Sequence, residues 1–346
     1  MKQKTIAIRC ITDEQKGFGH LSRCLSLGYT LKKNGYHIVF IINKNNSAIK
    51  EINKKNFQYI LIPQLISYRK ESDFIIKIMN SRKYDAIIID MREFSENLTK
   101  QLFGNIFKTI LLDDVWCDTV YSDILFNATT IKKFHKYKKK NINSKLFLGS
   151  KYFITNSEFQ KHKKKIYEIH DKKIYDIVVS MGGSDSNELT LKIIKSIMDL
   201  KNIKIEIIIG PFYKDLRKLR DLIKNKKHIS IVDSPPKIWK QFKKSDIVIA
   251  NAGSTLFELA IQKVPTMCIP VIKHQILYAE KFSMKGFSIN LGLWKYLKSN
   301  TIRKTLVEIL ENKEKRRKIS ALGDKLVDGK GLLRTTNVIS RLLNDK

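Results

Sequence analysis

The chain has 346 residues, of which 43% are hydrophobic, so its length favours two domains and its composition allows full-sized cores. No apolar run is long enough to span a bilayer, and Arg9 interrupts the first apolar run too early for a signal peptide. We therefore expect a cytoplasmic protein. Four scattered cysteines, with neither paired nor metal-ligand spacing, favour reduced thiols over a zinc site: Cys10, Cys24, Cys117 and Cys268.

The charge is strongly basic, with 66 Lys and Arg against 33 Asp and Glu and a formal net charge of +33. Three interpretations compete: nucleic-acid binding, attraction to an anionic membrane surface, and a general bias toward Lys, Ile and Asn. The basic clusters at 132–140 and 161–165 look like loops or solvated helix faces, and no nucleic-acid motif accompanies them. We favour compositional bias, with weak membrane-surface association second and nucleic acid last.

Strand and helix patterns alternate along the first half of the chain, which is typical of parallel sheets covered by helices on both faces. The expected strands are 5–11, 37–42, 59–62, 86–90, 109–113 and 124–127. The expected helices are 21–34, 48–55, 72–82 and 96–103. The polar stretch 130–145 is expected to form a loop or an excursion from the domain.

A second alternating series follows. Its expected strands are 175–180, 203–209, 228–232, 246–250, 266–269 and 288–291. Its expected helices are 187–200, 213–225, 236–243, 255–262, 276–285, 302–322 and 331–344. The charged stretch 158–173 is the best candidate for a linker.

Two alternating series predict an α/β protein with two Rossmann-like domains, an N-terminal one over 1–160 and a C-terminal one over 170–346. The last helix, 331–344, could pack back across the junction. In open parallel sheets, ligands bind at the carboxyl ends of the strands. We therefore expect a ligand in a central cleft that the two sheets face.

The turn Gly17-Phe18-Gly19-His20 follows the first expected strand and leads into a helix. Two glycines allow a sharp turn and a close approach to a ligand. A dinucleotide fingerprint would have a third glycine where Ser22 stands and an acidic residue where the second strand ends, at Asn43-Lys44-Asn45. The NAD interpretation is therefore poor. Because the helix dipole disfavours imidazolium, a neutral His20 could accept a proton; alternatively, it only caps the helix.

Met181-Gly182-Gly183-Ser184-Asp185 ends a strand and opens a helix in the second series. Gly182 and Gly183 expose backbone N–H groups and Ser184 adds a hydroxyl. With the helix N-terminus, this arrangement suits a phosphate or diphosphate. The alternative is an ordinary turn in which Ser184 or Asp185 is the N-cap.

Two later strand-to-helix junctions could complete a ligand site. In Asn251-Ala252-Gly253-Ser254-Thr255-Leu256-Phe257-Glu258, we expect three residues at the phosphate region: Gly253, Ser254 and Thr255. Glu258 could accept hydrogen bonds from ribose hydroxyls, although a capping arrangement is compatible with the same residues. His274 and Gln275 could reach the sugar of a ligand, or lie in a solvent-facing loop.

The order of these motifs resembles the two-domain GT-B superfamily. It is most similar to the branch that contains the hydrolase of pseudaminic acid biosynthesis, UDP-2,4-diacetamido-2,4,6-trideoxy-β-L-altropyranose hydrolase (PseG), and the SpsG-type spore-coat polysaccharide proteins. MurG-type glycosyltransferases share the C-terminal UDP site. Besides the motifs above, the resemblance rests on Arg23-Cys24-Leu25, Ile88-Ile89-Asp90, Leu112-Asp113-Asp114, Asp123-Ile124-Leu125-Phe126-Asn127, Gly149, Tyr152 and Glu158-Phe159.

The resemblance implies metal-free and cofactor-free hydrolysis of a UDP-linked amino-deoxy sugar, in pathways such as flagellin glycosylation and surface polysaccharide synthesis. His20 matches the family's general base, which activates a water nucleophile. The implied substrate-binding set in the N-terminal domain is Gly17, Gly19, Arg23, Asp90, Asn127 and Tyr152. Three positions depart from the family pattern: Ile11 replaces an Asp, Asn156 an Arg, and His274 an Asn.

Two other functions remain open. The first is a GT-B glycosyltransferase that uses the same UDP site and passes the sugar to an acceptor. The second is a binding module without catalysis, including a nucleic-acid binder attracted by the charge; it predicts tight, strongly salt-dependent binding to DNA or RNA.

Overall fold

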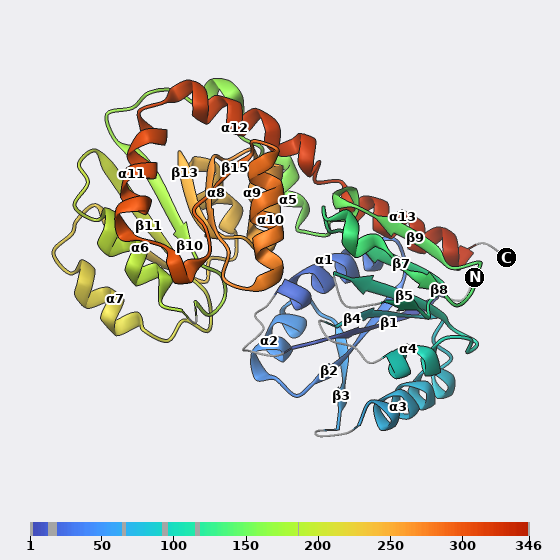
Figure 1. Ribbon diagram of the computed structural model, residues 1–346. Helices are drawn as coiled ribbons and strands as arrows, with labels where there is room; N and C mark the ends of the chain where they lie inside the picture. The colour runs from blue at the N-terminus through green and yellow to red at the C-terminus, as the bar shows by residue number, and fades with distance from the viewer. Residues whose placement is uncertain are drawn as a thin grey trace. The chain divides into compact units, whose positions relative to one another are not determined.

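The computed structural model describes residues 3–12, 19–63, 67–91, 96–114, 118–185 and 187–344. The chain divides into two compact units, which we call unit 1 (Met1–Asn156 with Lys330–Lys346) and unit 2 (Ser157–Gly329) (Figure 1). Unit 2 thus begins earlier in the sequence than the expected domain boundary. The last helix is part of unit 1.

Unit 1 contains a seven-stranded parallel sheet in the order β3-β2-β1-β4-β5-β7-β9. Its strands are β1 (Thr5–Cys10), β2 (His37–Asn43), β3 (Gln58–Ile62), β4 (Ala86–Asp90), β5 (Lys108–Asp113), β7 (Ile124–Asn127) and β9 (Lys145–Leu148). A separate two-stranded sheet consists of β6 (Thr119–Val120) and β8 (Lys138–Lys139). The strand order reverses between β1 and β4, and such a switch point is where open parallel sheets bind ligands.

Strand alternation sorts the side chains of unit 1 into two cores. Ile6, Ile8 and Cys10 of β1 lie in one core, while Ala7 and Ile87 lie in the other. The first core is covered by α1 (Gly19–Lys33), α2 (Asn46–Lys54) and α13 (Gly331–Asn344). The second is covered by α3 (Tyr68–Ser81) and α4 (Glu96–Leu102) (Figure 1).

Unit 2 repeats this topology with a six-stranded parallel sheet in the order β12-β11-β10-β13-β14-β15. Its strands are β10 (Tyr175–Ser180), β11 (Ile203–Ile209), β12 (Ile229–Asp233), β13 (Ile247–Asn251), β14 (Thr266–Ile269) and β15 (Ser288–Asn290). Its switch point lies between β10 and β13. The two sheets confirm the predicted α/β class with two Rossmann-like domains.

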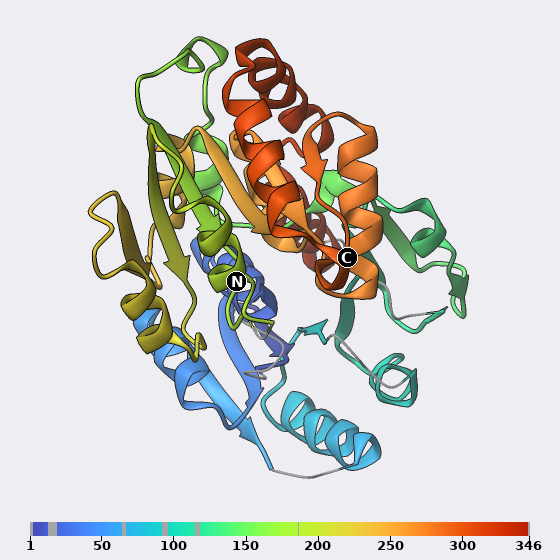
Figure 2. The ribbon, with the colours of Figure 1, turned by 60° about the vertical axis from the view of Figure 1, so that its left-hand side comes forward.

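The helices of unit 2 bury both faces of its sheet, and consecutive residues of β10 from Ile177 to Ser180 are buried accordingly. The helices are α5 (Ser157–Lys161), α6 (Leu189–Ile197), α7 (Leu216–Ile223), α8 (Ile238–Lys244), α9 (Ser254–Gln262), α10 (Lys273–Met284), α11 (Ser299–Leu310) and α12 (Lys313–Leu326). α12 packs against both α9 and α11 (Figure 2).

One expectation about secondary structure was wrong. The segment 302–322 is not one helix, because the side chain of Asn312 accepts a hydrogen bond from the backbone N–H of Lys315 at 2.8 Å and caps a new helix, α12. The stretch 130–145 is largely irregular apart from a 3₁₀ turn and the two residues of β8, and the unexpected strand β9, which pairs in parallel with β7, begins at its end. Four 3₁₀ turns were also missed: Lys132–His135, Ser150–Tyr152, Ile166–Glu168 and Trp294–Tyr296.

The stretch 158–173 is not a linker, since it packs into unit 2. Phe159 and Lys164 are buried, and the backbone N–H of Lys164 donates to the carbonyl oxygen of Gln262 at 2.8 Å. Its lysines suggested solvation, but the aliphatic part of a lysine side chain can be buried.

No helix in the described ranges is both long and apolar enough to cross a membrane.

Gly331, the first residue of α13, provides a test of how this helix packs. A Cβ at Gly331 would lie 2.1 Å from the carbonyl oxygen of Phe153, and backbone atoms cannot move aside as side chains do. We expect Gly331→Ala to lower the free energy of unfolding by roughly 2–3 kcal/mol, measured by urea denaturation.

Gly28→Ala is the matched control, because a Cβ there would approach only the ends of side chains, the nearest at 3.3 Å from Ile8. Its free energy of unfolding should change by no more than about 1 kcal/mol. Equal stability of the Gly331→Ala variant and the wild type would show that α13 does not pack this closely.

Candidate functional site

The switch point of unit 1 brings His20 next to Asp90. His20 lies in the first turn of α1, and Asp90 is the last residue of β4. The Nδ1 atom of His20 lies 2.7 Å from Oδ1 of Asp90, whose side chain is completely buried. An ionised carboxylate only accepts hydrogen bonds, so Nδ1 must carry a proton. In the neutral ring, the lone pair is then on Nε2, which can accept a proton.

Arg23, one turn further along α1, holds the buried carboxylate in its ionised form. Its Nε and Nη2 both donate to Asp90, and its Nη1 donates to Oδ1 of Asp114 at 2.9 Å. Burial alone would raise the pKa of Asp90, but the charges and hydrogen bonds of Arg23 and His20 hold it well below its usual value. Burial would lower the pKa of the Arg23 guanidinium, but the nearby carboxylates of Asp114 and Asp90 raise it above its usual value.

Two residues expected to bind substrate contact each other. The oxygens of the buried Asp90 are engaged by His20, Arg23 and the thiol of Cys24, whose Sγ lies 3.2 Å from Oδ2. Arg23 is engaged by two carboxylates, those of Asp90 and Asp114. Asp114 was not assigned to the site from the sequence, although it directly follows the strand that ends in Asp113.

Asn127, also expected to bind substrate, is held by hydrogen bonds within unit 1. Its side chain is buried, and its Nδ2 donates to the carbonyl oxygens of Asp114 and Phe134 at 2.9 and 3.1 Å. Its Oδ1 accepts the backbone N–H of Thr129 at 2.9 Å. Asn127 therefore organises the loops that follow β5 and β7.

The other expected residues of unit 1 divide into three cases. Tyr152 packs its ring against Phe126 and Phe147, with ring centroids 5.7 and 5.4 Å away. Gly19 is exposed at the start of α1. Gly17 lies outside the described residues, as does Cys117.

Arg9 forms a buried ion pair that the sequence analysis did not identify. Its Nε lies 2.8 Å from Oε1 of Glu71, and its Nη2 donates to Oδ1 of Asn43 at 2.9 Å. Ile11, which departs from the family pattern, donates its backbone N–H to the carbonyl oxygen of Asp90 at 3.2 Å. No sequence signal pairs Arg9 with Glu71, since 62 residues separate them.

The turn after β10 differs from the expected phosphate loop. Gly182 has a φ of +91°, which glycine adopts readily. The carboxylate of Asp185 accepts the backbone N–H groups of Leu189 at 3.0 Å and Thr190 at 2.8 Å. Asp185 therefore occupies the amides at the start of α6, while Ser184 caps nothing. Burial raises the pKa of Asp185 despite these hydrogen bonds.

The helix N-terminus after β13 begins differently. Its N-cap residue is Gly253, which has no side chain to cap the helix, and the exposed Ser254 and partly exposed Thr255 follow it. The dipole and N–H groups of a helix start favour an anion. Glu258 lies one turn into α9 and is partly exposed. The two predicted phosphate loops thus differ in their caps: Asp185 takes two amides of α6, and Gly253 offers no side chain to those of α9.

Gln275 and Asn251 lie beside the start of α9. A Cβ on Gly253 would lie 3.4 Å from Nε2 of Gln275 and 3.6 Å from Oδ1 of Asn251. Gln275 is buried, and its Oε1 accepts the backbone N–H of Val271 at 2.9 Å. The Nε2 of Gln275 is thus directed toward Gly253, not held in a solvent-facing loop. The ring of His274 packs edge-on against Tyr278.

Within the part of the chain that the structure describes, no group of three or more His, Cys, Asp or Glu side chains is arranged to hold a metal ion.

Curated relatives match almost the whole chain. It is 24% identical over 333 residues to the spore coat polysaccharide biosynthesis protein SpsG of Bacillus subtilis, covering 95% of each chain. It is 25% identical over 288 residues to the UDP-2,4-diacetamido-2,4,6-trideoxy-beta-L-altropyranose hydrolase of Campylobacter jejuni, covering 82% of this chain and 98% of the relative. These relatives confirm the resemblance found in the sequence.

Solved structures agree with the fold. MurG of Acinetobacter baumannii superposes with a TM-score of 0.71 over 98% of this chain and all of that one, at 13% identity, which supports the GT-B fold alone. The model of the glycosyltransferase family 28 C-terminal domain matches residues 155–329, half of the chain. That match coincides closely with unit 2. This protein therefore belongs to the family with the glycosyltransferase family 28 C-terminal domain.

Proposed function

We propose that this protein is a nucleotide-sugar hydrolase that releases UDP from a UDP-linked 2,4-diacetamido-2,4,6-trideoxy hexose. The observation that carries the proposal is the pairing of His20 with the buried, ionised Asp90 at a switch point. A relative that covers most of the chain is named as a hydrolase of this substrate type. Family 28 membership and the α9 N-terminus support binding of the nucleotide portion.

In the proposed reaction, His20 is the general base. Its Nε2 takes a proton from a water molecule as the oxygen attacks the anomeric carbon of the sugar. Asp90 keeps Nδ1 protonated and stabilises the positive charge that develops on the ring. Arg23, held by Asp114 on its other side, keeps Asp90 ionised and oriented.

The bond that breaks joins the anomeric carbon to the diphosphate oxygen, and UDP leaves with the electron pair. Water supplies the oxygen and one hydrogen of the new hydroxyl group. Its other proton is taken up by His20, which then releases it to solvent. The N–H groups at the start of α9 would stabilise the negative charge of the departing diphosphate, because they are already oriented before the reaction. Glu258 would accept hydrogen bonds from the ribose, and Gln275 with His274 would contact the ligand near the diphosphate.

A glycosyltransferase is the second candidate, and the family 28 match favours it. It would use the same donor site, with His20 deprotonating an acceptor hydroxyl in place of water. The two reactions differ in whether UDP release requires an acceptor.

The first prediction concerns His20. Wild-type protein with UDP-2,4-diacetamido-2,4,6-trideoxy-β-L-altrose should release UDP and free sugar without an acceptor, and His20→Ala should lower kcat by about 10²–10⁴-fold. In ¹⁸O-labelled water, mass spectrometry should find the label on the sugar and not on UDP. UDP release that needs an added acceptor would select the glycosyltransferase, and equal rates for both proteins would exclude His20 as the base.

The second prediction separates positioning from contact. Asp90→Asn keeps the size of the side chain and removes its charge, so His20 loses the partner that stabilises its protonated ring. We expect kcat to fall on the order of 10²-fold while KM changes less than about twofold. Steady-state kinetics would measure both constants, with thermal melting to verify folding. A large rise in KM at unchanged kcat would indicate that Asp90 contacts the substrate after all.

The third prediction tests the α9 donors. Ser254→Pro removes one backbone N–H at the first position of the helix, where proline is well tolerated. We expect UDP binding to weaken about tenfold, as for the loss of one hydrogen bond to a charged group, measured by calorimetry. Ser254→Ala keeps the N–H and isolates the contribution of the hydroxyl. Unchanged affinity in Ser254→Pro would remove the α9 amides from the diphosphate site.

A further inference from the structure

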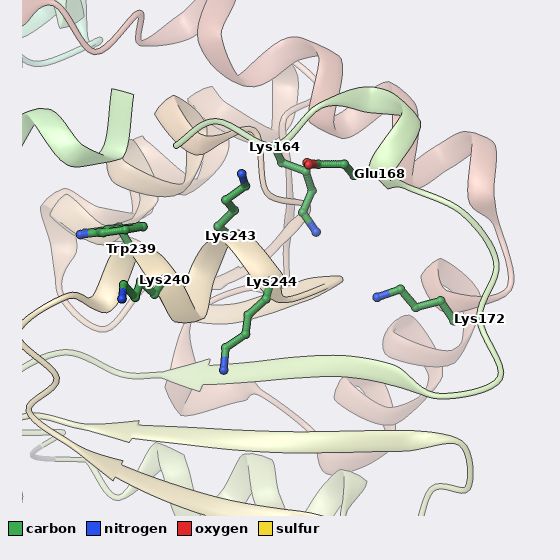
Figure 3. A pocket seen from close by; sticks show the side chains of 7 residues that line it. All are labelled: Lys164, Glu168, Lys172, Trp239, Lys240, Lys243 and Lys244. Atoms are coloured by element: carbon green, nitrogen blue, oxygen red, sulfur yellow. The ribbon is translucent and has the colours of Figure 1, made fainter. Parts of the chain in front are cut away.

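Unit 2 contains a lysine-rich pocket away from the residues assigned above. It has a volume of 380 Å³. Two parts of the chain line it: α8 on one side and the segment around the 3₁₀ turn Ile166–Glu168 on the other (Figure 3). The lining residues are Lys164, Glu168, Lys172, Trp239, Lys240, Lys243 and Lys244, which we call the lysine pocket.

Lys164 is the buried cation of the lysine pocket. It is only 4% exposed, and its Nζ donates to the carbonyl oxygen of Ser245. An ammonium group has three donors, so one carbonyl leaves donor capacity unused. The structure gives Lys164 no ion pair within the described residues. Burial of an ammonium group is costly, the nearby carboxylates of Asp246 and Glu168 offset part of that cost, and an anion in the pocket would offset more of it.

The other lysines fall into two groups. Lys172 pairs with Asp246 at 2.9 Å and Asp176 at 3.6 Å, and Lys244 pairs with Glu206 at 3.5 Å. In contrast, Lys240 and Lys243 have no carboxylate partner among the described residues. Lys164, Lys240 and Lys243 therefore face a single lining carboxylate, that of Glu168. This excess of positive charge matches a ligand with about two negative charges.

The walls of the pocket are held in place before any ligand arrives. Trp239 stacks on the ring of His162, with centroids 3.9 Å apart and planes 3° from parallel. The buried Gln262 donates through Nε2 to the carbonyl oxygens of His162 and Trp239 at 3.1 and 3.0 Å. These contacts fasten α8 to the segment that carries Lys164, so binding would require little ordering of the backbone.

We propose that the lysine pocket is an anion site for a phosphate-bearing dianion, separate from the site proposed for the sugar nucleotide. The buried ammonium of Lys164 binds one phosphate oxygen and Lys243 binds from α8, while Lys240, whose Nζ lies over the ring of Trp239, adds positive charge at the edge of the pocket. Lysine acts here as a point charge toward phosphate. A free phosphate compound and a lipid headgroup that ends in phosphate share this chemistry.

Binding should depend on pH through Lys164. Burial lowers the pKa of its ammonium group to about 8, with the nearby Lys172 acting in the same direction and Asp246, Glu168 and Asp176 opposing it. A bound anion favours the protonated form. Affinity should therefore be highest below pH 8 and should fall as the pH rises through that value, and binding near pH 8 should take up protons.

The test titrates full-length protein with inorganic pyrophosphate at pH 7 by calorimetry, with UDP present to occupy any nucleotide site. Wild type should bind it, and Lys243→Met should weaken binding about tenfold. Lys304→Met is the matched control, because Lys304 is exposed on α11 and does not line the pocket. Lys164→Met, checked by thermal melting, should weaken binding and abolish proton uptake near pH 8.

A second arm identifies the source of the phosphate. The same variants are sedimented with vesicles of phosphatidylcholine containing phosphatidic acid, and with phosphatidylcholine alone. Loss of binding in Lys243→Met but not in Lys304→Met supports the site, whether it appears with pyrophosphate or only with phosphatidic acid. If Lys243→Met and Lys304→Met behave alike in both arms, the lysine pocket is not an anion site.

Discussion

The buried carboxylate of Asp90 is the interaction on which the rest of the candidate active site depends. A carboxylate without solvent is unfavourable unless charged donors surround it, and here His20, Arg23 and Cys24 approach its two oxygens. The low pKa that results keeps the negative charge in place and selects the tautomer of His20. Asp114 extends the network by neutralising the second side of Arg23. As a consequence of that burial, Nε2 of His20 is the ring nitrogen that carries the lone pair.

The two units use the same topology for different purposes. In unit 1, a side-chain network occupies the switch point between β1 and β4. In unit 2, the junctions after β10 and β13 end in helix N-termini with backbone N–H donors. The carboxylate of Asp185 accepts the first two N–H groups of α6, while the N-cap residue of α9 is Gly253, which has no side chain, so the two glycine-rich turns differ in the donors that they offer a phosphate. We attribute the diphosphate to α9 for that reason.

The lysines that line the pocket in unit 2 differ in whether a carboxylate pairs with them. Lys172 and Lys244 pair with carboxylates, whereas the buried Lys164 donates to a carbonyl oxygen and has no ion pair among the residues that the structure describes. Compositional bias explains why lysine is abundant in this chain, but it does not explain a buried ammonium in a preformed pocket. The segment 158–173, read from the sequence as a solvated linker, supplies both the buried cation and part of the wall that surrounds it.

The sequence by itself determined the order of strands and helices, the two-domain organisation and the glycine-rich junctions, because apolar periodicity and turn residues are local signals. It also singled out His20, Gly253 and Ser254. Only the tertiary structure decided which groups meet: Asp90 lies 70 residues from His20, and Arg23 lies 91 residues from Asp114. The partners of Asp90, Arg23 and Asn127 could not be predicted from the sequence for this reason, since burial and hydrogen bonds depend on contacts between distant segments.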